Sequence, residues 1–338
     1  MRQRAKGYRW LWWLVGLVVL GAAGSAAFVW QWLDRPLPLA RPSIELSIEP
    51  GTSPRDVAEA WVQAGIQTQA QWLYAWFRWS GEARRIRAGS YEAHAGVTPR
   101  SLLDMLVQGR ETLETVRFIE GWTVRQLRQA LASAAHLRPA TAGWDDARLM
   151  QELGSPGVNP EGRFFPDTYA YARGVSDLTV LRRAHRLMQQ RLDQAWAERA
   201  PDTPLRSADE ALILASIVEK ETGLAADRPT IAGVFVNRLR IGMPLQTDPT
   251  VIYGLGEAFD GNLRKRDLQT DTPYNTYTRT GLPPGPIALP GMASLRAAVR
   301  PQATRALYFV ARGDGSSVFS ETLAEHNRAV NRYQRGQP

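Results

Sequence analysis

The first hydrophobic run in the chain is long enough to cross a membrane. Between Trp10 and Trp32, 23 consecutive residues carry no charge, and tryptophans stand at both ends of the run. A helix of that length spans about 34 Å, whereas the hydrocarbon core of a bilayer is about 30 Å thick. Because tryptophan prefers the membrane–water interface, the pattern predicts a transmembrane helix at 10–32 with an aromatic belt at each end.

Charged residues on either side predict the orientation of this helix. Residues 1–9 contain four basic residues and no acid, whereas Asp34 follows the hydrophobic run. By the positive-inside rule, we expect a cytoplasmic tail at 1–9, a single-pass anchor in the inner (plasma) membrane, and a periplasmic or otherwise extracytoplasmic remainder. A cleaved signal peptide is the competing interpretation, since small residues at 24–26 offer a cleavage site. A signal sequence, however, has a hydrophobic run of only about 7–15 residues, so we favour the anchor.

Beyond the anchor, the hydrophobic pattern becomes that of short folded elements. Residues 33–42 hold three prolines without helical periodicity, which predicts an extended linker. The following pattern predicts strands at Ile44–Ile48 and Ile86–Ala93 and, between them, helices at Pro54–Ala64 and Gln69–Trp79. This β-α-α-β order resembles the LysM fold, a small module that binds glycans containing N-acetylglucosamine.

A LysM-like subdomain is therefore expected at 43–110. Within it, three tryptophans share one helical face, which is more typical of a core than of a sugar platform: Trp72, Trp76 and Trp79. A pattern of the form Gly-x-Ser/Thr-x-Arg-x-Val/Leu begins at Gly51, Gly96 and Gly121. It indicates either a duplicated carbohydrate-binding unit or, more simply, similar strand-to-helix turns, because glycine permits a tight turn and Ser or Thr caps a helix.

The remainder, 111–338, alternates short strands and helices with loops rich in glycine and proline, which predicts a mixed α+β domain. Near its end, Leu307–Val310 and Val318–Ser320 are expected to form a hairpin, followed by a final helix at about Glu321–Arg332. We expect this domain to carry the chemistry of the protein.

One helix in this domain is expected to be central and to end in charges. Ser207 and Glu210 form a capping box, and the run Ala211–Val218 is apolar on nearly every side. Glu219 and Glu221 follow at once. A carboxyl on such a helix loses hydration, so its pKa is expected to rise, as a general acid requires near neutral pH. The helical period alone does not choose between the two glutamates.

Composition excludes several classes of protein. The absence of cysteine rules out a disulfide scaffold, a thiol nucleophile and cysteine-ligated metal. None of the three lysines follows a glycine, so there is no P-loop. The net charge is +8, and half of it lies on residues 1–9 rather than on the folded part, so we expect no nucleic-acid partner. The four histidines lack metal-ligand spacing, and we expect neither a metal nor a cofactor.

Six segments resemble, in the same order, the motifs of one family. They are Glu120–Thr123, Glu161–Tyr169, Leu214–Thr222, Val234–Leu239, Leu245–Gly254 and Tyr274–Ile287. The family is MltG (YceG-like), the membrane-anchored endolytic murein transglycosylases. The resemblance runs from the anchor to the final helix, and it implies a YceG-like catalytic domain at 111–338.

This resemblance implies cleavage of the β-1,4 bond between N-acetylmuramic acid and N-acetylglucosamine within peptidoglycan strands. The first glutamate of the Ile-Val-Glu-Lys-Glu-Thr motif carries the catalysis, which here is Glu219. It protonates the glycosidic oxygen and then removes the proton of the muramic acid C6 hydroxyl, which closes on C1 as a 1,6-anhydro end. Such cleavage terminates or trims nascent strands, and peptidoglycan synthases in the same membrane are implied as partners.

Other motif residues are expected to contact sugar. Amides suit N-acetyl and hydroxyl groups, and aromatic faces suit a pyranose ring; the expected contacts are Gln246, Thr247, Asp248, Asn275 and Tyr277. Each of them also fits an ordinary turn. Glu161 and Asp167 are expected to brace a loop instead. Two alternatives to the transglycosylase remain: a muramidase in which water attacks, and a non-catalytic membrane-tethered glycan binder that scaffolds synthases.

Overall fold

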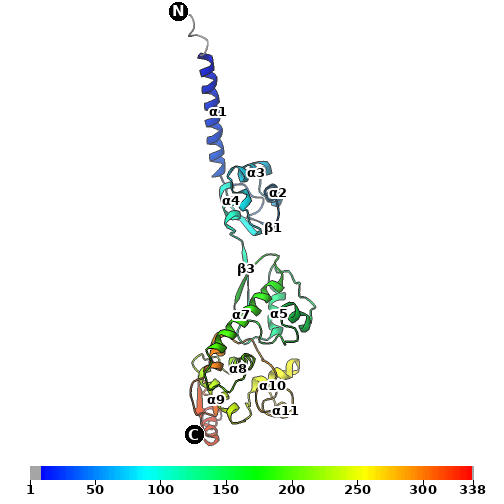
Figure 1. Ribbon diagram of the computed structural model, residues 1–338, viewed down its shortest axis with the longest axis vertical. Helices are drawn as coiled ribbons and strands as arrows, with labels where there is room; N and C mark the ends of the chain where they lie inside the picture. Colours follow the sequence, from blue (N-terminus) through cyan, green and yellow to red (C-terminus); the bar gives the residue numbers. More distant parts are fainter. Residues whose placement is uncertain (1–8, 337–338) are drawn as a thin grey trace, which may run out of the picture. The chain divides into compact units, whose positions relative to one another are not determined.

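The computed structural model describes residues 9–336 and has mixed α and β structure, as expected (Figure 1). The chain forms two compact units. The first extends to Glu114 and also includes Ala172–Gly174, and the second comprises Thr115–Tyr171 and the chain from Val175 onward. The basic tail expected at 1–9 lies outside the described residues, except for Arg9.

The first unit begins with one long apolar helix, α1 (Arg9–Leu33). Its segment Trp12–Leu33 is long and apolar enough to cross a membrane, and no residue of its most apolar 18-residue stretch is buried. By length and composition it fits either a membrane anchor or a signal sequence.

The folded part of the first unit has the predicted β-α-α-β order. Its elements are β1 (Ser43–Ile48), α2 (Pro54–Ala64), α3 (Ala70–Trp79), the short η1 (Ala83–Arg85), β2 (Gly89–His94) and α4 (Pro99–Gln108). The strands pair antiparallel, with Ser43 opposite His94 and Ile48 opposite Gly89. The core lies between this strand pair and the helices, and Trp61, Phe77 and Tyr91 are its largest buried side chains.

The recurring glycine pattern is explained by its turns. Gly51, Gly96 and Gly121 all have a positive φ, which glycine adopts without strain. Two residues later in each case, a Ser or Thr side chain accepts a hydrogen bond from a backbone N–H in the first turn of the following helix. Similar strand-to-helix turns are therefore sufficient to produce the repeat.

The second unit is built around helices. Its elements up to the central helix are α5 (Val124–Ala132), α6 (Asp146–Glu152), α7 (Asp177–Ala197) and α8 (Ala208–Glu221). Strand β3 (Leu113–Arg117) pairs with β4 (Thr168–Ala172). The later elements are α9 (Arg228–Arg240), α10 (Asp248–Leu255), η2 (Gly256–Ala258), α11 (Lys265–Gln269), α12 (Met292–Val299), β5 (Tyr308–Ala311), β6 (Ser317–Ser320) and α13 (Leu323–Gln334).

Helix α8 occupies the centre of this unit, as its apolar pattern predicts. The hydroxyl of Ser207 caps it by accepting a hydrogen bond from the N–H of Glu210, at 3.2 Å. Its residues from Ala211 to Val218 are buried except for Ile213, and α7, α9 and α12 pack against it. Burial on nearly every side leaves only the C-terminal end of α8 available for polar chemistry.

Two loops close over that end of α8. The N–H of Gly121 donates to the carbonyl of Leu289, and the N–H of Leu289 donates to the carbonyl of Trp122. Gly162 packs so closely against Pro286 that a Cβ would overlap the proline ring. Three motif segments that are far apart in the sequence are thereby joined into one surface.

Candidate active site

The carboxyl of Glu219 is buried and held by two donors. Its side chain, in the last turn of α8, is only 4% exposed. Oε1 accepts a hydrogen bond from Nη2 of Arg228 at 3.0 Å, and Oε2 accepts one from the N–H of Gly291 at 2.9 Å. Arg228 begins α9 and Gly291 precedes α12, so three helices fix the position of this carboxyl.

A second carboxyl belongs to the same cluster. Oε2 of Glu120 lies 4.0 Å from Nη2 of Arg228, and this side chain is 49% exposed. A Cβ at Gly291 would overlap the Glu120 carboxyl, so the two glutamates flank the same glycine. Partial burial and then the negative charge of Glu219 raise the pKa of Glu120, and Arg228 opposes that shift.

Arg228 connects the two carboxyls. Its side chain is 12% exposed, and its Nε is buried without a hydrogen-bond partner among the described residues. A buried guanidinium needs compensating charge, and Glu219 and Glu120 provide it. Lys220, the residue after Glu219, donates a hydrogen bond from Nζ to the carbonyl of Gly121 at 3.3 Å.

Glu221 points to different surroundings, although it stands on the same turn of α8. Residues two apart on a helix are separated by about 200° around its axis. The carboxyl of Glu221 accepts a hydrogen bond from the hydroxyl of Thr247. Burial raises the pKa of Glu221 to about 7, while the Thr247 hydrogen bond opposes the shift and Asp248 adds to it. The raised pKa expected for a carboxyl on this helix is therefore found at Glu221.

A hollow of about 570 Å³ opens beside Glu221, and three of the expected sugar contacts line it: Gln246, Asp248 and Tyr277. The Tyr277 hydroxyl donates to Oδ1 of Asp248 at 2.6 Å. Gln246 has a φ of 47°, a left-handed backbone conformation that non-glycine residues rarely adopt. Arg238 of α9 and residues of β5, β6 and α13 form the rest of the wall. The tertiary structure thus groups these three side chains with Glu221, and Glu219 does not line this hollow.

The other two expected contacts lie beneath the surface. Asn275 is fully buried, and its Nδ2 donates to the carbonyls of Asp267, Leu268 and Thr270. Thr247 is 2% exposed, and its N–H donates to the hydroxyl of Thr276. Both residues hold the loops in place, which differs from the direct contact expected from their polar, loop-like sequence context.

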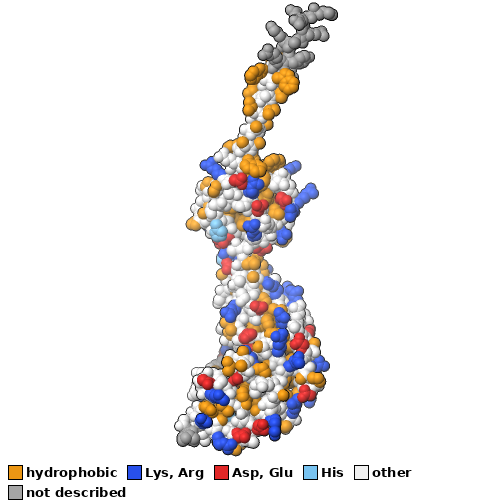
Figure 2. All heavy atoms as spheres, turned by 90° about the vertical axis from the view of Figure 1, so that its left-hand side faces the viewer, with side chains coloured by type: hydrophobic (Ala, Val, Ile, Leu, Met, Phe, Trp, Pro, Cys, Tyr) orange, Lys and Arg blue, Asp and Glu red, His pale blue; other side chains and the backbone are white. Residues whose placement is uncertain are grey.

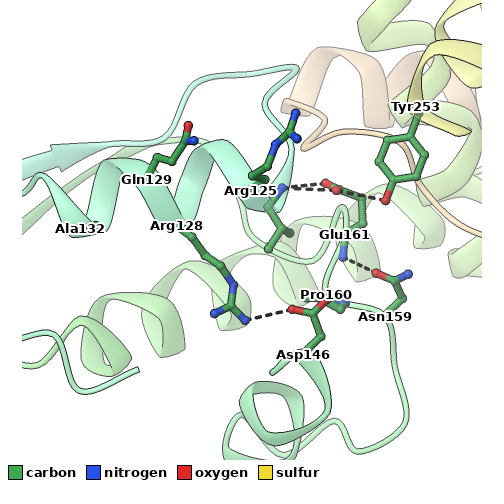
Figure 3. Close-up of a pocket in the computed structure, with 10 residues that line it drawn as sticks. Arg125, Arg128, Gln129, Ala132, Asp146, Asn159, Pro160, Glu161 and Tyr253 are labelled. Carbon is green, nitrogen blue, oxygen red and sulfur yellow. Dashed lines mark hydrogen bonds and ion pairs between the residues drawn. The ribbon is translucent and has the colours of Figure 1, made fainter. Parts of the chain in front are cut away.

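Glu161 braces the surrounding loops, as its place in a Gly/Pro-rich loop suggests. It is 5% exposed and accepts hydrogen bonds from the N–H of Val124 at 3.1 Å and from the Tyr253 hydroxyl at 3.2 Å (Figure 3). Burial outweighs these donors and raises its pKa to about 7. A hollow of about 510 Å³ lies beside Glu161, and Arg125 and Arg128 of α5 are among the residues that line it. The carboxyl ties the start of α5 to α10.

Sequence reasoning gave no role to Glu120 or Arg228. Glu120 stands in one of the family motifs, so the motif could have identified it as a candidate site residue. Arg228 follows Glu219 by nine residues across a turn between helices, and no local period joins the two. Within residues 9–336, no group of three or more His, Asp or Glu side chains is arranged to hold a metal ion.

Comparison with known proteins yields a consistent set of matches. A family model described as the YceG-like family matches residues 46–332. A protein of Bacillus subtilis (strain 168) named endolytic murein transglycosylase is 32% identical over 311 residues, which cover 87% of this chain and 86% of the relative. A protein of the same name from Streptococcus pneumoniae (strain D39) is 25% identical over 353 residues, and the match spans 94% of this chain but only 63% of that relative. Among solved structures, a YceG-like protein of Listeria monocytogenes matches with a TM-score of 0.53 and 27% identity, over 85% of this chain and 98% of the other.

Proposed function

Because the chain belongs to the YceG-like family and is an endolytic murein transglycosylase, as its relatives are named, we propose that Glu219 is its catalytic carboxyl. The observation that carries this proposal is the fixed position of the group. Two donors from different helices hold the Glu219 carboxyl within a cluster that contains a second acid. Catalytic groups gain most when their geometry is set before substrate binds.

The reaction needs one proton donor that becomes a proton acceptor. Glu219 donates a proton to the oxygen that links muramic acid C1 to the glucosamine, and the C1–O bond breaks with its electron pair on that oxygen. The carboxylate then accepts the proton of the muramic acid C6 hydroxyl, whose oxygen bonds to C1. The products are a 1,6-anhydro end and a glucosamine with a free hydroxyl, and the carboxyl is again protonated. Ordinary glycosidases use two carboxyls and a water for this bond, whereas here the substrate supplies the nucleophile.

Arg228 and Glu120 stabilise the site as the charge on Glu219 changes during the reaction. When Glu219 is protonated, the guanidinium of Arg228 loses its ion-pair partner in a buried position, which is costly. Glu120 lies 4.0 Å from the same Nη2 and serves as the alternative partner. We therefore assign Glu120 and Arg228 as positioning residues for the two protonation states of Glu219.

The hollow beside Glu221 is proposed as part of the glycan-binding surface. Tyr277 offers an aromatic ring, while Gln246 and Asp248 offer an amide and a carboxylate, which suits sugar hydroxyl and N-acetyl groups. Asn275 and Thr247 support this surface through their buried hydrogen bonds. The strained backbone at Gln246 supports the same assignment, since such strain is concentrated at functional sites.

For the rest of the chain, we propose a retained membrane anchor at 10–32 with its N-terminus in the cytoplasm and the remainder in the periplasm or its equivalent. Residues 43–110 are proposed as a LysM-like glycan-binding subdomain, on the basis of their β-α-α-β order. The catalytic domain then comprises 111–338, and peptidoglycan synthases of the same membrane are proposed partners.

Digestion of purified sacculi by the full-length protein in detergent tests this function. Mass spectrometry of the released glycan is expected to find 1,6-anhydro ends. Reducing ends, which are one water heavier, would identify a hydrolytic muramidase instead. Binding to sacculi without any release would support the non-catalytic scaffold.

A further inference from the structure

Helix α3 leaves two tryptophans on the outside of the first unit. Leu73 and Phe77 on its inner face are fully buried, whereas Trp72 is 43% exposed and Trp79 is 73% exposed. Exposed aromatic side chains next to one another mark a surface that contacts a partner. We call the surface formed by Trp72, Ala75 and Trp79 the α3 aromatic surface.

The α3 aromatic surface continues directly onto α1. The ring of Trp72 lies 5.8 Å from that of Trp32 and 6.2 Å from that of Phe28, measured between centroids. Side chains from α1 and α3 together line an apolar hollow of about 350 Å³. Figure 2 shows hydrophobic side chains (orange) covering the α1 rod and continuing onto the part of the first unit beside it.

Several contacts hold the end of α1 against the folded part. Leu33 is 2% exposed, and the N–H of Leu37 donates to the carbonyl of Val97 at 2.8 Å. Arg100 forms an ion pair with Asp34 at 2.9 Å, and its guanidinium lies over the ring of Trp30 at 5.2 Å. The exit of α1 is thus fixed beside α3.

We propose that the α3 aromatic surface rests in the interfacial layer of the membrane that holds α1. Trp30 and Trp32 form the aromatic belt expected at the outer interface, and Trp72 touches Trp32, so α3 lies at the same depth. Exposed Arg78 in the last turn of α3 adds positive charge to the same helix, which anionic lipid headgroups attract. The proposal rests on the proposed membrane anchor, and the partner is a phospholipid surface.

The absence of cysteine allows a direct test of depth in the full-length protein. Single cysteines are introduced as Ala75→Cys and Trp79→Cys, spin-labelled, and reconstituted in vesicles of phosphatidylethanolamine and phosphatidylglycerol. The collision rates of each label with oxygen, which concentrates in lipid, and with a water-soluble nickel complex are then compared. Ala75→Cys keeps both tryptophans, so the result does not depend on removing an aromatic ring.

Two control positions calibrate the depth scale. Val19→Cys lies in α1, where the side chain is 59% exposed, and reports whether that helix is inserted. Thr52→Cys replaces an exposed residue that lies four residues after Ile48, the last residue of β1. That end of the paired strands is about 17 Å from the Ser43–His94 pair at the other end. His94 accepts a hydrogen bond from the N–H of Val97, and the carbonyl of Val97 accepts one from Leu37, which follows α1. The Ser43–His94 end of the strand pair is therefore the end near α1, and Thr52 is at the opposite end.

Labels at 75 and 79 are expected to have an oxygen-to-nickel ratio several times that at 52 and below that at 19. A ratio equal to that at 52 would overturn the proposal, because the surface would then face water. Protection from both reagents would also overturn it, since a protein or glycan would be the occupant. A low ratio at 19 would refute the anchor itself and this proposal with it, whatever the catalytic result on sacculi.

Discussion

The carboxyl groups of Glu219 and Glu221 lie on different sides of the last turn of α8. Arg228 and the N–H of Gly291 hold the first, and the hydroxyl of Thr247 contacts the second. One carboxyl is therefore ion-paired next to another acid, while the other is buried with a pKa raised to about 7. Their different partners give the two glutamates different expected roles.

Replacing Glu219 by glutamine is expected to abolish release of anhydro ends while leaving the fold intact. The amide cannot donate and then accept the catalytic proton, and loss of a general acid–base typically costs about 10²–10⁴-fold in rate. The measurement is mass spectrometry of digested sacculi, together with thermal unfolding. Glu198→Gln, an exposed position after α7, is the matched control and should retain activity. Full activity of Glu219→Gln would refute the assignment.

Removing Arg228 is expected to destabilise the protein because the Glu219 charge would remain buried without its partner. Loss of one partner of a buried pair costs about 3–5 kcal/mol. Arg228→Met should therefore lower the midpoint of thermal unfolding, and the double variant Arg228→Met/Glu219→Gln should recover most of the loss without recovering activity. Additive losses in the double variant would show that the two groups are not coupled.

Placing a methyl group at Gly291 is expected to displace Glu120. The φ of Gly291 is −79°, which alanine adopts freely, so the effect is the overlap of the new Cβ with the Glu120 carboxyl. Gly291→Ala should reduce the rate on sacculi by about tenfold or more, in the range of a misplaced catalytic group. In a Glu120→Ala background the same substitution should cost little more, and an equal loss in both backgrounds would contradict the role of Glu120.

The raised pKa of Glu221 predicts that the protein becomes less stable as pH rises. The folded state holds the proton up to about pH 7, whereas an unfolded glutamate releases it near pH 4.5. Stability from this group is thus complete below pH 4.5 and falls by up to about 3 kcal/mol as pH rises through 7. Glu161 shifts in the same direction, also to about 7.

Glu221→Gln removes one of these two contributions. Its unfolding midpoint should depend less on pH between 4.5 and 7 than that of the wild type, as measured by thermal unfolding in a series of buffers. The remaining slope should become smaller again when Glu161→Gln is added. An unchanged slope in both variants would show that neither carboxyl carries a raised pKa.

Asn275 and Tyr277 are expected to respond differently to substitution. Asn275→Ala removes a fully buried amide that donates to three backbone carbonyls, and the loss of its hydrogen bonds is expected to cost about 1–3 kcal/mol and to lower the unfolding midpoint. Tyr277→Ala removes a ring from the proposed glycan surface and should raise KM several-fold with a smaller change in the unfolding midpoint. If both substitutions changed KM and the unfolding midpoint equally, Asn275 would not be a purely structural residue and Tyr277 would not be a glycan contact.

Elements with strong local signals agree with the sequence prediction. Helix α2 has the predicted bounds, because the signals for its ends are local: Ser53 and Pro54 stand at its start, and Gly65 follows its last residue. The hydrophobic period likewise predicted that α8 is central and that its charges come at one end. The family motifs then pointed to Glu219.

Contacts between distant segments required the tertiary structure. Periodicity could not choose between Glu219 and Glu221, because their difference lies in partners from other parts of the chain: Arg228, Gly291 and Thr247. Nor does a polar side chain in a loop reveal its exposure. Asn275 is turned inward, where its amide donates to three backbone carbonyls, whereas Tyr277, two residues later, lines a hollow. Local sequence governs helices and turns because their hydrogen bonds are local, but burial and charge pairing depend on how the segments pack.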